Sequence, residues 1–333
     1  MKRVTALIFI VAIVPLAIGV EWWVAVAMLS ITAYASLILI DAIMFRGDVY
    51  TTAVQPLIIS ALMQLVPWVI FPFVVTDFSH WPATLLAIAS GAVGILGYWL
   101  YFHAMEDDQD AVVISIIWNL MIALVPVMAY VFIGEELGLV QYVGIGLIFT
   151  GALVATFQKA KAKGKVVAMM VGAVTMLSLS VVGMKEVYNL LEAAGNESVY
   201  WSGYLPRALG CGLVGLFFLT GTLRKQQSRV EFVSLVKVFW PVFLLTEALQ
   251  ISADMLTSLA TTGGPISVVI AMDGLLGMFT AGLAVLVVFA LMCNKVRFGL
   301  RRAALRFRNE QFEHFGLKVS GMALITIGAY LAT

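Results

Sequence analysis

The segment GIGLIFTGALVA at residues 144–155 recurs at residues 321–332 as GMALITIGAYLA. Both copies carry glycine, leucine-isoleucine, glycine-alanine and a final alanine at the same spacing, in segments that are almost entirely apolar. Small residues at such intervals let membrane helices approach one another closely. A duplicated segment of this kind indicates that the chain contains an internal repeat.

Three further matches, in the same order along the chain, extend this repeat. They pair Trp81-Pro82 with Trp240-Pro241, Val112-Val113-Ile114 with Val268-Val269-Ile270, and Gln55-Pro56-Leu57 with Leu205-Pro206-Arg207. The matches align a first repeat at residues 22–157 with a second at 166–333. The alternative is chance similarity between apolar segments, which the common order and the shared Trp-Pro disfavour.

The composition places the chain in a membrane. Hydrophobic residues make up 62% of the 333 residues and charged residues only 12%, with a mean hydropathy of +1.01. Because soluble domains average about 25% charged residues, a soluble globular protein is excluded. The net charge of +1 excludes a globally basic nucleic-acid-binding protein.

Apolar segments of about 20 residues can each cross a bilayer, so the sequence predicts an all-α integral membrane protein with about 11 transmembrane helices. Five helices in each repeat would give the repeats opposite orientations, because five is an odd number. One further helix, at residues 1–21, would precede them, although this segment also resembles a signal peptide. The expected spans are 4–19, 22–45, 50–73, 81–104, 111–133, 138–157, 166–187, 200–221, 237–260, 265–292 and 315–332.

The basic residues predict the orientation, since cytoplasmic loops are enriched in lysine and arginine. With these spans, all basic residues except Lys185 and Arg207 fall on one side. The N-terminus is therefore expected inside and the C-terminus outside, in a bacterial or archaeal cytoplasmic membrane. A basic cytoplasmic linker is expected at 158–165. The insertion at 294–316 has the spacing of an amphipathic helix on anionic lipids, although a solvated basic loop remains the alternative.

A second group of motifs carries a resemblance to a known family. The chain has GYWLYFHA at 97–104, LVPV at 124–127, GEEL at 134–137, and the glycine-rich segment at 144–155. This succession resembles the drug/metabolite transporter superfamily, EamA-like branch. The second half keeps the closing glycine-rich segment, and its Pro206-Arg207-Ala208 resembles an arginine often found in the second helix of a repeat. At the position of the proline in LVPV, the second half has Phe279-Thr280-Ala281-Gly282.

Ionisable side chains inside a bilayer are costly and are therefore functional candidates. Arg207, Asp254 and Asp273 are expected about 10–12 Å from the outer ends of their helices, at ~1.5 Å per residue. Glu247, Gln250 and Asp254 fall at i, i+3 and i+7, on one helix face. Two interpretations remain open for these residues. Arg207 would hold an anionic group while Glu247 or Asp254 exchanges a proton, or Arg207 would form a structural pair with Asp254 or Asp273.

The first repeat offers polar and aromatic candidates for the same site. Asn119 is expected at a depth matching that of Asp273, with Trp118, Tyr98 and Tyr101 nearby. Aromatic side chains with one polar tip suit the wall of a pocket for an organic molecule, although membrane aromatics more often serve packing. Gln55 and Gln64 are weaker candidates, and Asp41 and Lys185 align between the repeats near helix ends.

These features predict a secondary active transporter that moves a small organic metabolite by alternating access, coupled to protons or driven by exchange. A non-transporting binding or scaffold protein of transporter descent is the alternative. No ATP-binding motif G-x-x-x-x-G-K-[ST], zinc-protease motif or serine-hydrolase motif occurs. We therefore expect no enzyme, no cofactor and no nucleic-acid partner. The sequence leaves the substrate, the direction of transport and the oligomeric state open.

Overall fold

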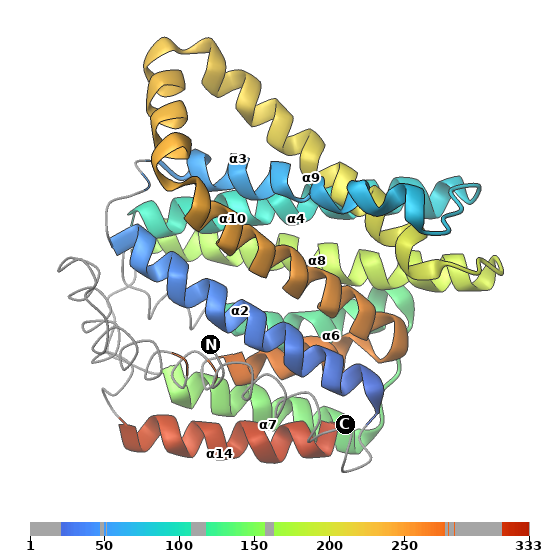
Figure 1. Cartoon of the computed structure of the whole chain (residues 1–333). Helices are drawn as coiled ribbons and strands as arrows, with labels where there is room; N and C mark the ends of the chain where they lie inside the picture. Colours follow the sequence, from blue (N-terminus) through green and yellow to red (C-terminus); the bar gives the residue numbers. More distant parts are fainter. Residues whose placement is uncertain are drawn as a thin grey trace, which may run out of the picture.

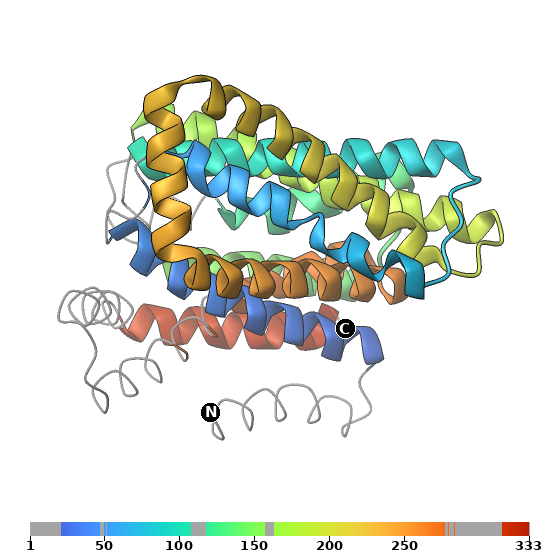
Figure 2. The same cartoon turned by 45° about the horizontal axis from the view of Figure 1, so that its top comes forward.

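The computed structural model describes residues 21–46, 50, 52–107, 118–156, 163–276, 279, 283 and 315–332. Every regular element in these ranges is a helix, and most of the helices run side by side in one bundle (Figures 1 and 2). The predicted all-α class is confirmed. The expected helix at 1–21, the insertion at 294–316 and most of the linker at 158–165 lie outside the described residues.

The helices of the first half agree closely with the spans expected at 22–45, 81–104 and 138–157. Of the span expected at 111–133, residues 111–117 lie outside the described residues and α6 begins at Leu120. One span differs. The span expected at 50–73 is divided, because an α-helix ends at Met63 and a tighter 3₁₀ helix begins at Val66. Pro67 lies in the first turn of the 3₁₀ helix, where its missing N–H is tolerated. The elements are α2 (Trp22–Arg46), α3 (Val54–Met63), η1 (Val66–Phe73), α4 (Trp81–Asp107), α6 (Leu120–Ile133) and α7 (Leu139–Thr156).

The helices of the second half are longer than expected at several ends. They are α8 (Gly164–Ala193), α9 (Val199–Arg224), α10 (Gln226–Gly263), α11 (Ile266–Ala271), η2 (Met272–Leu275) and α14 (Phe315–Ala332). The last of these agrees with the span expected at 315–332. A 3₁₀ segment, η2, directly follows α11. Most of the remainder of the span expected at 265–292 lies outside the described residues.

Several helices carry the length and the surface of membrane spans. Among the described residues, five helical segments are long and apolar enough to cross a bilayer: 54–73, 81–106, 164–193, 199–224 and 226–263. Large apolar side chains cover the outside of the bundle, such as Leu139 at 80% exposed and Phe217 at 73%. Exposure of this kind is unfavourable in water but natural in lipid. The protein is an integral membrane protein.

The duplicated glycine-rich segments pack against each other. In α7 and α14, which lie side by side (Figure 1), a Cβ on Gly144 would lie 2.6 Å from the carbonyl oxygen of Gly328. A Cβ on Gly151 would lie 2.6 Å from the carbonyl oxygen of Gly321. Both distances are shorter than real Cβ contacts, so only glycine permits this approach. Each copy of the motif therefore binds the other copy.

Helix α4 packs closely against α9 on one face and against α8 on another. The carbonyl of Arg207 in α9 lies so close to Gly91 that any side chain there would clash, and the carbonyl of Ile88 lies equally close to Gly210. On another face, the Ser180 hydroxyl of α8 donates a 2.7 Å hydrogen bond to the carbonyl of Ser90. Helix α4 thereby fixes the depth and direction of α9 at Arg207.

Helix α10 begins eleven residues earlier than the span expected from residue 237, so residues 226–236 form a helix and not a loop. This first part crosses the long helices of the bundle, and after a bend α10 continues alongside α2 (Figures 1 and 2). We attribute the bend to Pro241, which lacks the N–H for an i−4 hydrogen bond. The first part forms because Leu235 packs with Ile59 and Phe243.

The GEEL turn at 134–137 fastens the two halves together. Gly134 ends α6 with φ +65°, a left-handed conformation that favours glycine. Glu135 Oε1 then accepts a 2.8 Å hydrogen bond from the N–H of Ile266, and Glu135 Oε2 accepts one from the N–H and one from the hydroxyl of Ser267. The carboxylate therefore satisfies free donors in the first turn of α11.

Lys185 stabilises the neighbouring end of α10. Its Nζ donates hydrogen bonds of 2.8 and 3.1 Å to the carbonyls of Thr261 and Gly264. The last carbonyls of a helix lack intrahelical donors and attract cations. Lys185 itself does not lie near a helix end as predicted, because α8 continues to Ala193. Its side chain instead closes the turn between α10 and α11.

Candidate functional site

An ion pair between α9 and α10 lies at the centre of the candidate site. Arg207 Nη2 and Asp254 Oδ1 are 3.9 Å apart, and both side chains are largely buried, at 13% and 5% exposed. Of the two structural pairings open from sequence, the structure shows Arg207 with Asp254. Close packing between α4 and α9, at Gly91 of α4 and Gly210 of α9, holds the arginine at this level.

The first half of the chain supplies two hydrogen bonds to the same carboxylate. The Tyr34 hydroxyl of α2 donates to Asp254 Oδ1, and Gln64 Nε2 donates a 2.7 Å bond to Asp254 Oδ2. Gln64 follows directly after α3, where the span is divided. Asp254 is thus held by side chains from both halves of the molecule.

A second carboxyl group lies two helical turns away on α10. Glu247 is 4% exposed and Gln250 is 5% exposed. The Ser60 hydroxyl of α3 lies 2.9 Å from Glu247 Oε1 and 3.2 Å from Gln250 Oε1. Ser60 and Gln64, one turn apart beside α10, therefore each contact one of its two buried carboxyl groups.

Three buried polar atoms at the pair have no hydrogen-bond partner among the described residues. They are Arg207 Nη1, Gln64 Oε1 and the hydroxyl of Tyr204, whose ring lies 5.9 Å from the guanidinium carbon of Arg207. Buried polar groups are normally paired, so atoms of this kind indicate a place where a ligand can bind. Here they offer a cationic donor, an acceptor and a hydroxyl within one cluster.

Asp273 lies near this cluster, in the 3₁₀ segment that follows α11. It belongs to η2 and its charge acts on both Tyr34 and Tyr98. A 3₁₀ segment inside a longer helix often marks a functional hinge. The two 3₁₀ segments in the described spans thus lie next to Gln64 and at Asp273.

The predicted aromatic residues extend the cluster toward α6. Tyr98 is close enough to Arg207 and Asp254 to interact with both charges. Its ring centroid lies 6.4 Å from that of Tyr101 and 6.5 Å from that of Trp118, and the latter two are 5.2 Å apart. Asn119 follows Trp118 at the start of α6, and its side chain does not cap the helix.

The structure thus brings the predicted residues into two groups that share α3 and α10. Arg207, Asp254, Asp273 and the aromatics surround the ion pair, whereas Glu247 and Gln250 meet at Ser60. Sequence reasoning missed Tyr34, Ser60 and Tyr204, because a single hydroxyl in an apolar helix is a common packing residue. Gln64 was a weaker candidate, and its contact with Asp254 raises its importance. Among the described residues, no group of three or more His, Cys, Asp or Glu could hold a metal ion.

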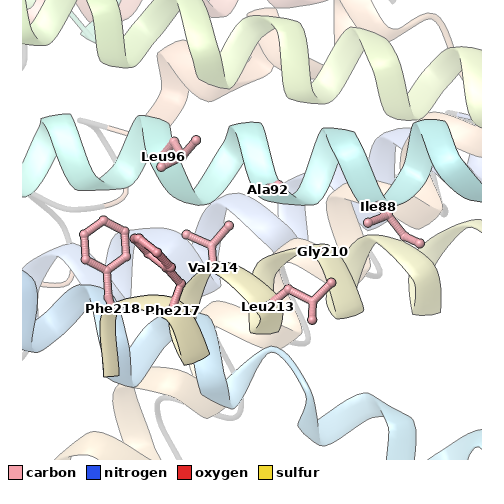
Figure 3. A pocket seen from close by; sticks show the side chains of 8 residues that line it. All are labelled: Ile88, Ala92, Leu96, Gly210, Leu213, Val214, Phe217 and Phe218. Carbon is pink, nitrogen blue, oxygen red and sulfur yellow. The ribbon is translucent and has the colours of Figure 1, made fainter. Parts of the chain in front are cut away.

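A separate apolar groove of about 370 Å³ lies between α4 and α9 (Figure 3). Its lining includes Ile88 and Leu96 from α4 and Leu213 and Phe217 from α9. Leu213 and Phe217 are exposed, so the groove opens on the outer surface of the bundle. Its chemistry suits a hydrocarbon tail, not the polar substrate that Arg207 and Asp254 would bind.

Comparison with known proteins agrees with the fold and with the expected resemblance. Residues 21–157 match the model of the EamA-like transporter family, which confirms the resemblance over this range. No curated protein matches the sequence. A solved structure described only as "Crystal structure of protein" has a TM-score of 0.58 over 92% of this chain and 96% of its own. At 12% identity, this likeness shows the fold alone.

Proposed function

Since residues 21–157 match the EamA-like transporter family, we propose that the protein is a secondary active transporter. It moves a small organic metabolite across the membrane by alternating access and is coupled to protons or driven by exchange. The observation that carries this proposal is the buried Arg207–Asp254 pair, which Tyr34 and Gln64 hold from the other half of the chain.

Two inverted repeats of five helices, at residues 22–157 and 166–333, form the framework of this mechanism. The self-pairing of the glycine motif supports the duplication, because Gly144, Gly151 and Gly328 each meet a carbonyl from the other copy. Inverted repeats place a substrate site at their interface, and rocking of one half against the other exposes the site alternately. The extra helix and the orientation, N-terminus inside and C-terminus outside, complete the proposed topology in a bacterial or archaeal cytoplasmic membrane.

The partnerless atoms at the ion pair indicate the chemistry of the substrate. Arg207 Nη1 can bind an anionic or carbonyl oxygen, while Gln64 Oε1 can accept a hydrogen bond. Tyr98, Tyr101 and Trp118 would contact the organic part of the molecule, as would Asn119 at its polar edge. Asp273 and Gln250 complete the polar lining. These polar contacts offset the free-energy cost of removing the substrate from water.

A scaffold protein of transporter descent is the second candidate function. The observation in its favour is that the buried charges Arg207, Glu247 and Asp254 all lie in the second half. Under this alternative, the protein would bind a ligand and not move it. The distinction therefore requires a flux measurement in addition to a binding measurement.

The first test is a thermal-shift screen of the purified protein in detergent with L-alanine, putrescine and glycerol 3-phosphate, each at pH 5 to 8. A ligand at 100 times its dissociation constant stabilises a protein by about 2.7 kcal/mol. For a compound that stabilises the protein, uptake into proteoliposomes is measured next. We expect saturable uptake that Arg207→Gln and Asp254→Asn abolish.

Matched controls separate the site from general effects of charge. Arg229→Gln and Glu136→Gln remove exposed charges of the same types and should leave uptake unchanged. Normal uptake by both Arg207→Gln and Asp254→Asn would contradict the proposed site. Binding without uptake in the unmodified protein would favour the scaffold.

A further inference from the structure

Glu247 differs from Asp254 in its surroundings, although both lie on one face of α10. Asp254 has Arg207 at 3.9 Å and accepts hydrogen bonds from Tyr34 and Gln64. Glu247 lies seven residues earlier, which at 1.5 Å per residue is about 10 Å along the helix. It accepts a hydrogen bond from, or donates one to, the hydroxyl of Ser60 on α3. The environment of Asp254 therefore suits a carboxylate, whereas that of Glu247 requires a separate account.

The hydrogen-bond donors and acceptors around Ser60 indicate the protonation state of Glu247. A serine hydroxyl has one hydrogen to donate and can also accept, yet Ser60 Oγ faces two acceptor oxygens, Glu247 Oε1 and Gln250 Oε1. If Glu247 is protonated, its O–H donates to Ser60 Oγ, and the Ser60 hydroxyl donates to Gln250 Oε1. Each contact in the chain then has one donor and one acceptor.

We propose that Glu247 is the proton-carrying group of the transporter, distinct from the Arg207–Asp254 pair that contacts the substrate. This inference rests on the proposed transport function and specifies its coupling ion and its coupling residue. Glu247 binds a proton in the conformation described here and releases it when α3 and α10 separate. The step moves one proton between the carboxyl group and water and needs no other reactant.

Helix α3 provides the mechanical link between proton and substrate. Ser60 of α3 contacts Glu247, and Gln64, directly after α3, contacts Asp254. Ser60 and Gln64 lie one helical turn apart. Gln64 also lies where the regular helix ends before the 3₁₀ segment. A displacement of α3 relative to α10 therefore breaks both contacts together. Loss of the proton and opening of the substrate site become one movement.

The other titratable groups around Glu247 determine which control variants the experiment needs. On α2, Tyr34 contacts Asp254, and the hydroxyls of Ser30 and Thr257 are 2.6 Å apart. The same antiparallel register places backbone position 41 of α2, an aspartate, at the level of Glu247. Tyr50 stacks on Phe243, one turn before Glu247 on α10. Tyr98 of α4, Arg207 of α9 and Asp254 of α10 belong to the ion-pair cluster. Asp41 is therefore the alternative proton carrier to be tested.

Infrared spectroscopy of the reconstituted protein tests the protonation state without any substrate. A protonated carboxyl group has a C=O stretching band that a carboxylate lacks. In vesicles of phosphatidylcholine and phosphatidylglycerol at pH 7, we expect this band to lose intensity in Glu247→Gln and to keep its intensity in Asp254→Asn and Asp41→Asn. Its loss in either of the latter variants, with its retention in Glu247→Gln, would overturn the assignment.

Transport assays between pH 5.5 and 7.5 test the coupling. For the probe among L-alanine, putrescine and glycerol 3-phosphate that the unmodified protein transports, we expect Glu247→Gln to retain counterflow at equal pH. The same variant should lose the stimulation of uptake by a pH gradient. Asp77, in an outer loop, cannot produce this effect, because hydrogen bonds from the backbone N–H and hydroxyl of Ser79 hold the pKa of its carboxyl below the usual value.

The outcomes distinguish failure of this inference from failure of the proposed function. Absence of counterflow in the unmodified protein would contradict transport itself. Counterflow that is present in the unmodified protein and lost in Glu247→Gln would assign Glu247 to substrate binding and overturn its role as proton carrier. A pH-gradient response that survives in Glu247→Gln and disappears in Asp41→Asn would transfer the role to α2.

Discussion

Arg207 and Asp254 combine charge and burial, and each therefore depends on the other for its stability. Removing one member of a buried pair leaves an uncompensated charge, which costs about 3–5 kcal/mol. We expect Arg207→Gln and Asp254→Asn each to lower the free energy of unfolding by about that amount. The double variant should lose clearly less than the combined single losses. Denaturant unfolding in detergent measures all three values.

Additive losses in that cycle would contradict an interaction across the 3.9 Å between the two groups. Arg207→Lys keeps the positive charge and serves as the conservative variant. It should lose less stability than Arg207→Gln, but it cannot reproduce the planar donor arrangement of arginine. The comparison separates the contribution of charge from that of guanidinium geometry.

At the same scale, residues differ in how far sequence alone could identify them. Arg207, Asp254 and Glu247 stand out because ionisable groups are rare and costly in apolar helices. Tyr34 and Ser60 carry no such signal, and only the packing of α2 and α3 on α10 reveals their contacts. Charge can thus be found by composition, whereas hydrogen-bond partners require the tertiary structure.

Among the elements, α7 and α14 depend most directly on side-chain size. A Cβ at Gly144 would lie 2.6 Å from Gly328 O and 2.7 Å from Ala332 N, both of them backbone atoms. Overpacking of this kind costs about 1–3 kcal/mol, so Gly144→Ala should lower the thermal midpoint in detergent. Gly146→Ala, on the same helix, has open space and should not lower the midpoint. Equal effects of the two substitutions would contradict the close contact.

Apolar segments of the sequence predicted most of the helices, but they did not predict where the 3₁₀ segments occur. The spans expected at 81–104, 138–157 and 315–332 agree closely with α4, α7 and α14. The division after α3 and the 3₁₀ segment η2 have no clear pattern, since apolar residues continue through both. The early start of α10 was missed because charged residues at 229 and 237 resemble a loop. Packing of Leu235 with Ile59 and Phe243 overrides that signal.

For the whole molecule, the proposed orientation makes opposite ends of α9 accessible from opposite sides. Asn196 precedes this helix and Gln227 follows it. The 26 residues of α9 span about 39 Å at 1.5 Å per residue, enough to cross a bilayer. In whole cells, an impermeant maleimide should label Asn196→Cys directly and Gln227→Cys only after permeabilisation. The reverse labelling would invert the topology. Both variants are made in a protein that carries Cys293→Ser, so that this cysteine is not labelled. Cys211 is buried and is left in place.

The contact between α7 and α14 has a consequence for the origin of the chain. Its two sides carry the same motif, so the surface is self-complementary in the manner of a two-fold symmetric dimer interface. A single repeat with this motif already has what it needs to bind an oppositely oriented copy of itself. Gene fusion of two such units would preserve the interface and require no new one. Each copy could then diverge elsewhere, which allows the buried charges to collect in one half while the glycines remain in both.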